Sequence, residues 1–244
     1  MRKIGEERTS VASFRSVDGN YMWSYNRNYY LGEDMENNNN YSKIIGEIVS
    51  DFKFSHYTCG EKFFLVYVSV GRLSGAKDII RVMTSERLID VKKNLIGSIV
   101  DIVGQIRVYR ARGGERSHLM VSVFAMDIRF VNDSCDFANN NLTILDGYIC
   151  KNPVYRKTPL GREVSDIILA VNRRYGKSDY IPCICWWRNA RFANTLNVGT
   201  RIRVQGRVQS REYVKKLSDM ESETRTAYEV SISKLEVIDS GKEN

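Results

Sequence analysis

The stretch that decides the fold runs from Lys151 to Ala190 and reads KNPVYRKTPLGREVSDIILAVNRRYGKSDYIPCICWWRNA. It contains two runs rich in β-branched, aromatic and other apolar residues, 164–172 and 179–187, with turn residues around them. Residues of these types suit a pleated, half-buried surface, and turn residues between such runs mark strand ends. The stretch therefore predicts β-strands rather than a helical domain.

The next run, Leu196 to Tyr213, reads LNVGTRIRVQGRVQSREY. Its apolar residues and its arginines alternate with a period of two. Alternate side chains of a strand point to opposite faces. One face carries Ile202, Val204, Gly206 and Val208, and the other carries Arg201, Arg203, Arg207 and Arg211. We expect a core-packing face backed by a stripe of arginines. Along 180–187 the same alternation does not by itself say which face is the core.

A similar pattern occurs earlier in the chain. The segment NLIGSIVDIVGQIRV at 94–108 matches TLNVGTRIRVQGRVQ at 195–209, and glycines recur at a near-constant offset of about a hundred residues. The matched pairs are Gly97 with Gly199, Gly104 with Gly206, Gly46 with Gly147 and Gly60 with Gly161. Self-similarity at a fixed offset indicates duplicated architecture.

Four motifs of the second copy occur in an order that resembles the bacterial single-stranded DNA-binding protein family, whose fold is the five-stranded OB-fold. They are N-P-x-x-R-x-T-P-x-G at 152–161, L-A-V-N-R at 169–173, Y-x-P-x-x-x-W at 180–186 and V-G-x-x-I-x-V-x-G-R at 198–207. The resemblance covers about the C-terminal two fifths of the chain. With the duplication, it predicts an all-β protein with minor helix, built as two tandem OB-folds, each a five-stranded Greek-key barrel.

We expect a flexible polar and aromatic leader with an Asn-rich linker at 1–40, a first repeat at 41–135, a second repeat at 136–239 and a short tail at 240–244. The first repeat should contain strands at 44–54, 63–73, 78–85, 98–109 and 121–130, with a helical stretch at 86–93. The second should contain strands at 143–150, 164–172, 179–187, 200–211 and 226–237, with a helical stretch at 189–196. The Tyr-rich leader has no sustained hydrophobic period, which favours a disordered segment. The alternative interpretation is an arm that stacks on bases or docks on a partner.

The resemblance also implies which residues contact DNA. Base-stacking aromatics match Tyr180 and Trp186, and Trp187 stands where the family keeps glycine, so which tryptophan stacks stays open. The full expected set of DNA-binding residues is Arg156, Arg173, Arg174, Tyr175, Lys177, Tyr180, Trp186, Arg188, Arg203, Arg207, Arg211, Tyr213 and Lys215. Aromatic rings stack on unpaired bases of any identity, and cations neutralise phosphates. The formal charge of +8 fits a polyanionic partner.

The first repeat lacks the matching aromatic and basic residues. At an offset of 102, Asp78 stands in place of Tyr180, Thr84 in place of Trp186 and Gln105 in place of Arg207. We expect a degenerate OB-fold with a structural or assembly role. Its auxiliary phosphate contacts would be Arg107, Arg110 and Arg112, although an exposed hairpin is the simpler interpretation.

Other residue patterns argue against catalysis. The five cysteines, Cys59, Cys135, Cys150, Cys183 and Cys185, form no CxxC pair, and an odd, scattered set favours neither a disulfide framework nor a zinc site. Cys183 and Cys185 are expected to face the core. His56 and His118 have no metal or triad spacing, and no phosphate-binding loop motif occurs. We therefore expect a protein that is not an enzyme and needs no cofactor. No apolar run is long enough for a membrane span, so we expect a cytoplasmic, nucleoid-associated protein.

The expected function is sequence-nonspecific binding and protection of single-stranded DNA in replication, recombination or repair. Two alternatives remain: a primosomal-type assembly factor that bridges replication proteins, and an RNA-binding OB module. Family members typically end in an acidic tail with a terminal Pro-Phe, whereas this sequence stops at Ser-Gly-Lys-Glu-Asn (240–244), so recruitment by that tail is not expected. Single-OB family members commonly form tetramers, and a tandem chain is therefore expected to form a homodimer with four barrels.

Overall fold

The computed structural model describes residues 12–17, 20–25, 38–111, 118–131, 140–173, 176–216 and 222–238. It divides into two units, Met1–Asn38 and Asn39–Asn244. In the first unit, strands β1 (Ala12–Val17) and β2 (Asn20–Tyr25) pair antiparallel, with Phe14 opposite Trp23. The sequence predicts no regular structure here, and the structure differs. The signal was the two-residue spacing of Tyr21, Trp23 and Tyr25, which is a strand period.

The first repeat forms a closed five-stranded barrel in which the pairing order is β5, β6, β8, β7, β3 and back to β5. Its strands are β3 (Asn40–Ile48), β5 (Glu61–Gly71), β6 (Lys77–Ser85), β7 (Ile99–Ala111) and β8 (His118–Phe130). A short strand, β4 (Lys53–Thr58), pairs with β5 outside the barrel. Only the β6–β8 pair among them is parallel, as the OB-fold requires.

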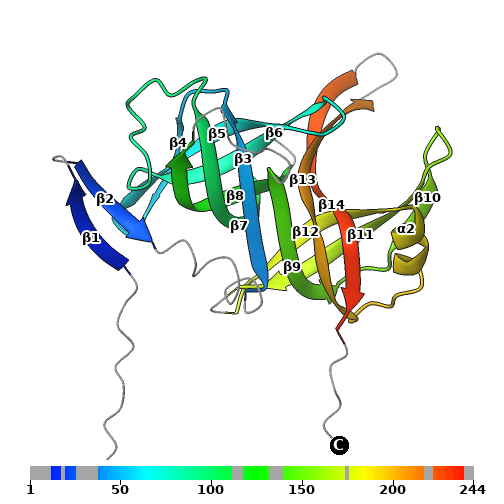
Figure 1. Ribbon diagram of the computed structural model, residues 1–244. Helices are drawn as coiled ribbons and strands as arrows, with labels where there is room; N and C mark the ends of the chain where they lie inside the picture. The colour runs from blue at the N-terminus through cyan, green and yellow to red at the C-terminus, as the bar shows by residue number, and fades with distance from the viewer. Residues whose placement is uncertain are drawn as a thin grey trace, which may run out of the picture. The chain divides into compact units, whose positions relative to one another are not determined.

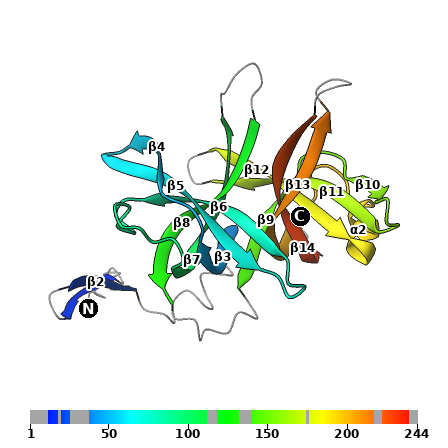
Figure 2. The same ribbon diagram turned by 90° about the horizontal axis from the view of Figure 1, so that it is seen from above.

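The second repeat has the same order, from β11 through β12, β14 and β13 to β9 and back to β11. Its strands are β9 (Asn141–Ile149), β11 (Glu163–Asn172), β12 (Ser178–Trp186), β13 (Arg201–Lys216) and β14 (Ser222–Val237), with β10 (Val154–Lys157) as the counterpart of β4. Each strand expected from the sequence is present in both repeats. The prediction of two tandem OB-folds is confirmed (Figures 1 and 2).

The two barrels join through their first strands. Strands β3 and β9 pair antiparallel, so the two barrels share one continuous sheet of twelve strands (Figure 1). Ser42 lies opposite Thr143 in this pair, and their hydroxyl oxygens are 2.9 Å apart. Since these two residues are also equivalent in the duplication, the two barrels are related by an approximate twofold arrangement about this point. The pairing covers the first half of β3, because β5 pairs with β3 only at Glu47 and Ile48 and would leave that half as an exposed edge.

The strand registers correct the alignment of the two repeats. Asp78 lies opposite Val70, and Asp179 lies opposite Val171, so Asp78 corresponds to Asp179 at an offset of 101. The counterpart of Tyr180 is therefore Ile79 and not Asp78. By the same offset, Ser85 and not Thr84 replaces Trp186. The offset becomes 102 only at the fourth strand, because the segment between the third and fourth strands is one residue longer in the second repeat.

That same segment also differs in its secondary structure. In the second repeat it begins with helix α2 (Trp187–Ala193), close to the stretch expected at 189–196. The helix expected at 86–93 is absent, and the structure has turns there instead, with Leu88 N–H bonded to Ser85 O and Lys93 N–H to Asp90 O. Asp90 also accepts a bond from the Lys92 N–H. An aspartate that bonds to the backbone two residues on favours a turn over a helix.

Two cysteines pack inside the second barrel, as expected once the family resemblance had chosen between the two faces of the strand. Cys183 and Cys185 are buried, whereas Cys59 is exposed in the turn between β4 and β5. Burial raises the pKa of Cys185 to about 12 and raises that of Cys183 as well. Thiolates are the reactive form. In the native protein at pH 8 we expect iodoacetamide to modify Cys59 rapidly and Cys183 and Cys185 only after unfolding, as peptide mass spectrometry would show. Equal native rates at the three thiols would contradict this packing.

Candidate nucleic-acid interface

Strand β13 separates its two faces as the sequence predicts. Ile202, Val204 and Val208 are buried in the barrel. The arginines between them lie on the outer side, and each keeps part of its surface exposed. Those arginines are Arg201, Arg203, Arg207 and Arg211. The predicted arginine stripe therefore lies on the outside of the second barrel.

Strand β12 resolves the alternation that the sequence left open. Ile181, Cys183 and Cys185 are buried in the core. Tyr180 is 54% exposed on the opposite side. Trp186 lies on that side too, half-buried, and its indole N–H donates a hydrogen bond of 3.0 Å to Ser231 Oγ on β14. The ring is held in place by this bond while one part of its surface stays accessible.

Trp187 follows directly and has an unusual backbone. Its φ is +52°, in the left-handed region, and its side chain is 55% exposed. This conformation favours glycine and strains a bulky residue. It explains why a glycine suits this position in the family that the sequence resembles. Both adjacent tryptophans thus present surface, and the geometry leaves each of them able to contact a base.

The long β13–β14 hairpin adds a further aromatic and a cation. Tyr213 is 37% exposed, and the Arg211 guanidinium lies 5.9 Å from the centre of its ring. Arg211 also lies 3.7 Å from Glu229, so its charge is shared with a carboxylate. Arg207 makes no hydrogen bond or ion pair within the described part of the chain. Burial, with the nearby Arg72, lowers the pKa of Arg207, while Asp78 opposes that effect. A partly buried guanidinium without a bonded acid is suited to an external phosphate.

The structure describes only some of the remaining expected contacts. Arg156 on β10 forms an exposed ion pair with Asp166, 2.9 Å from Nε to Oδ2. Lys177 and Arg188 are exposed. Arg174, Tyr175 and the side chain of Lys215 lie outside the described residues, as do the side chains of Arg110 and Arg112. For all of these, contact with DNA stays a prediction.

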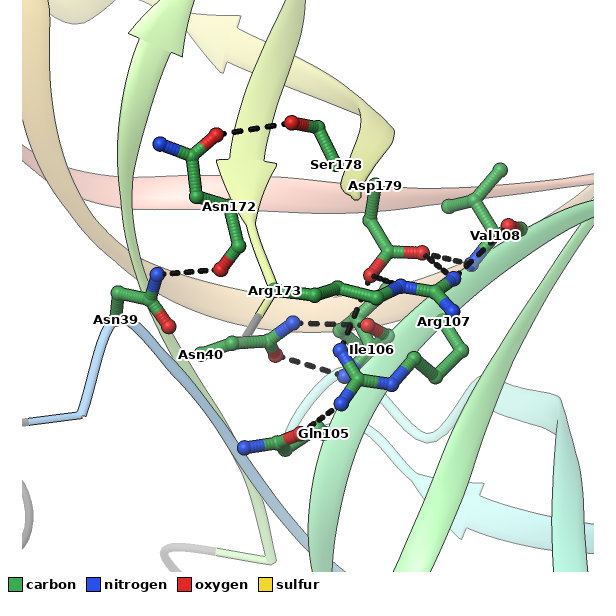
Figure 3. Close-up of polar contacts among 10 residues, drawn as sticks. All are labelled: Asn39, Asn40, Gln105, Ile106, Arg107, Val108, Asn172, Arg173, Ser178 and Asp179. Carbon is green, nitrogen blue, oxygen red and sulfur yellow. Dashed lines mark hydrogen bonds and ion pairs between the residues drawn. The ribbon is translucent and has the colours of Figure 1, made fainter. Parts of the chain in front are cut away.

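Arg173 has a different environment from the one expected. Its guanidinium forms a bidentate ion pair with Asp179, a carboxylate that is fully buried (Figure 3). The same carboxylate accepts a bond of 2.7 Å from the Val108 N–H and lies 3.1 Å from Arg107 Nη1, both on β7 of the first repeat. Asp179 therefore links the two barrels. We call Asp179 with Arg107, Arg173 and the Val108 N–H the Asp179 clasp.

The equivalent aspartate of the first repeat, Asp78, makes a matching set of contacts with the second repeat. Arg72 holds Asp78, 2.6 Å from Nε to Oδ2, and Asp78 accepts a bond of 2.8 Å from the Ser210 N–H on β13 of the second repeat. The Ser210 hydroxyl in turn accepts a bond from the Ile79 N–H at 2.9 Å. Each barrel thus extends a buried aspartate to the fourth strand of the other. The sequence contained a signal for this, namely the R-x5-D spacing of both pairs, 72 to 78 and 173 to 179.

The Asp179 clasp changes how two arginines are interpreted. Arg107, expected to be either an auxiliary phosphate contact or part of an exposed hairpin, is half-buried and paired with Asp179; burial lowers its pKa, while that carboxylate opposes the effect. The hydrogen bond from Arg173 to Asp179 raises the pKa of Arg173. Both side chains are already engaged inside the protein. The contacts that they make in the structure are within the protein, and contact of Arg173 with DNA stays a prediction.

Two further searches cover only the residues that the structure describes. Among them, no three His, Cys, Asp or Glu side chains are grouped so that they could bind a metal ion. None of the helices described there is long and apolar enough to cross a membrane.

Comparison with known proteins finds sequence relatives of the second repeat. Residues 140–238 match the model of the Single-strand binding protein family. "Single-stranded DNA-binding protein A" of Bacillus subtilis is 39% identical over 80 residues, which are 30% of this chain and 46% of that protein. "Single-stranded DNA-binding protein" of Clostridium tetani is 36% identical over 80 residues, 30% of this chain and 55% of that protein. The chain thus spans about half the length of the curated relatives it matches. The resemblance of the second repeat to this family is confirmed.

Solved structures extend the likeness to both repeats. The single-stranded DNA binding protein from Thermus aquaticus has a TM-score of 0.66 to this chain at 21% identity, over 84% of this chain and 95% of that one. A deletion mutant of the same protein gives 0.63 at 20% identity, over 84% and 98%. At this identity the likeness shows the fold, and it covers two OB barrels in one chain.

Proposed function

We propose that this protein binds single-stranded DNA without sequence preference, mainly through the outer face of the second repeat. The observation that carries the proposal is the joint exposure of Tyr180, Trp186 and Tyr213 beside the arginines of β13. The family match of the same repeat supports it. In cells, such a protein would coat and protect single strands during replication, recombination or repair, at the nucleoid in the cytoplasm.

Binding would combine two physical contributions. Each base that stacks on an exposed ring adds about 1–3 kcal/mol, whatever its identity. Each phosphate that an arginine or lysine neutralises releases counterions, which adds affinity that declines as salt rises. The rings hold the bases on one side while the cations follow the backbone. No step of this process requires bond chemistry, so an enzymatic role is no part of the proposal.

The experiment that tests the proposal compares equal-length oligomers by fluorescence anisotropy at one salt concentration. We expect tight binding of poly-dT, weaker binding of poly-rU and much weaker binding of a blunt duplex. Preference for poly-rU would favour the RNA-binding alternative. Absence of binding to any of the three would favour the assembly-factor alternative and overturn the proposal.

Salt dependence tests the arginine stripe. For single strands the logarithm of affinity falls by about 0.7 per neutralised phosphate for each tenfold rise in salt. Replacing Arg207 and Arg211 by glutamine should reduce this slope by up to about 1.4, two such contributions. Titrations from low to high salt measure it. The matched control is Arg129→Gln, which removes a charge from an exposed pair with Asp127 in the first repeat. A slope that stays at the wild-type value in the double variant would show that the stripe does not face the strand.

We also propose a homodimer that presents four barrels, because a tandem chain corresponds to two single-OB subunits. Closed twofold assemblies are the commonest oligomers. Multi-angle light scattering should give twice the chain mass of 28.1 kDa. A single-chain mass at micromolar concentration would contradict it. We also propose the domain division expected from the sequence, with a leader at 1–40, a first repeat at 41–135, a second repeat at 136–239 and a short tail at 240–244.

A further inference from the structure

A groove of about 1250 Å³ lies between the two barrels and adjoins the outer face of β12 and β13 just described. One wall comes from the first repeat, from β5, β6 and the start of β8. The other wall comes from the β13–β14 hairpin of the second repeat, and Pro182 on β12 lies at its edge. The sequence assigns no binding role to the first-repeat wall.

Arg81 is the central feature of the groove. Its guanidinium lies between two tyrosine rings, 4.9 Å from the centre of Tyr228 and 5.9 Å from that of Tyr67. Its Nη1 lies 3.1 Å from Met120 Sδ, and its Nε is buried without a hydrogen-bond partner. Within the described residues no carboxylate pairs with it. A thioether is a weak acceptor, so most of the five N–H donors of this cation lack a strong partner among the residues that the structure describes.

The neighbouring rings do not neutralise the charge. Burial raises the pKa of Tyr228, with Tyr67 adding to the effect and Arg81 opposing it, so the phenol stays protonated at physiological pH. The rings instead hold the guanidinium in one orientation by cation–π contact. A fixed, partly dehydrated arginine without an acid is suited to bind a phosphate group.

The groove is continuous with the proposed DNA-binding face. Tyr213, one of the expected stacking residues, also lines the groove, and Arg211 lies against its ring. Lys77 lines the opposite wall, is exposed, and has no ion-pair partner in the described parts of the chain. A strand that leaves the second repeat along the hairpin would therefore reach Lys77 and Arg81 next.

We propose that this groove is a second contact site for single-stranded DNA, in which Arg81 binds a backbone phosphate and Lys77 a neighbouring one. The inference rests on the proposed function and extends it to the first repeat. The first repeat then has a binding role that its alignment with the second hides, because the counterpart of Arg81 at the offset of 101 is Pro182. A strand would cross from one barrel to the other through this groove.

The test compares two oligomers of dT on the full chain. One has about 8 nucleotides, within the site of a single OB-fold, and the other about 30, near the upper limit for two. Arg81→Gln should weaken binding of the long oligomer about tenfold, as expected for one lost charge-assisted contact, and leave the short one unchanged. The salt slope for the long oligomer should fall by about 0.7. Lys77→Gln, at an exposed position that the fold does not need, should show the same pattern with a smaller loss.

Arg129→Gln serves as the matched control, since it removes the same charge from the first repeat away from the groove. Loss with Arg81→Gln or Lys77→Gln, but not with Arg129→Gln, supports the proposal. Equal affinity of all variants for the long oligomer, with wild-type binding of both oligomers intact, overturns this inference and leaves the proposed function standing. The assignment to DNA is also overturned if Arg81→Gln keeps full affinity for the long oligomer but no longer binds an oligo-glutamate peptide that the wild type holds. Failure of the wild type to bind either oligomer overturns both.

Discussion

Replacing Asp179 by alanine is expected to lower the free energy of unfolding by about 3 kcal/mol, the low end for breaking a buried ion pair. The carboxylate is fully buried, and its loss would leave Arg107, Arg173 and the Val108 N–H without their shared acceptor. Both arginines keep about a quarter or more of their surface exposed, so water compensates in part. Urea denaturation followed by circular dichroism measures the change.

Two variants make the stability measurement specific to the clasp. Asp127→Ala removes a carboxylate from an exposed pair with Arg129 and should change stability by no more than about 0.5 kcal/mol. Asp78→Ala breaks the reciprocal contact to Ser210 and should resemble Asp179→Ala. If Asp179→Ala unfolded at the same urea concentration as Asp127→Ala, the clasp would not stabilise the pair of barrels.

Combining Trp186→Ala with Tyr213→Ala is expected to weaken binding to an unstructured DNA oligomer by about 2–6 kcal/mol, the sum of two stacking contributions. The two side chains lie on different strands and, in the described part of the chain, make no hydrogen bond or ring contact with each other, so their effects should be close to additive. Each single variant should lose about 1–3 kcal/mol. Anisotropy titrations measure the loss, and circular dichroism verifies that the variants remain folded.

Two controls separate stacking from general effects on the surface. Phe130→Ala removes an exposed ring from the end of β8 in the first repeat and should not alter affinity. Trp187→Ala decides between the adjacent tryptophans, since a loss there equal to that of Trp186→Ala would show that both contact bases. Folded Trp186→Ala and Tyr213→Ala variants with wild-type affinity would refute the aromatic platform.

The sequence predicted the fold well because its signals were local and repeated. The alternation along 202–208, the turn glycines and the offset between the repeats each depend on backbone geometry that a strand imposes wherever it lies. The buried side of β12 followed only with the help of the family resemblance. Both faces of that strand carry apolar residues, and Ile184 on the outer side is itself buried.

The sequence did not predict what depends on contacts between the barrels. Arg173 looked like a phosphate contact, because the R-x5-D spacing alone does not show that Asp179 would be buried against β7 of the other repeat. Arg81 gave no signal, since Tyr67 and Tyr228 reach it from different repeats. The one-residue shift in the offset placed Asp78 opposite Tyr180 and concealed its match to Asp179. The absent helix at 86–93 depended on turn bonds of Asp90 that compete with helix formation.

The central claim is that a single strand lies on the outer face of the second repeat. Photo-crosslinking tests it most directly, with a dT oligomer that carries 5-iododeoxyuridine at successive positions and is bound to the full chain. We predict crosslinks, located by peptide mass spectrometry, at Tyr180, at Trp186 or Trp187, and at Tyr213. Bound oligomer that crosslinks elsewhere in the chain, with none of these residues modified, would contradict the account.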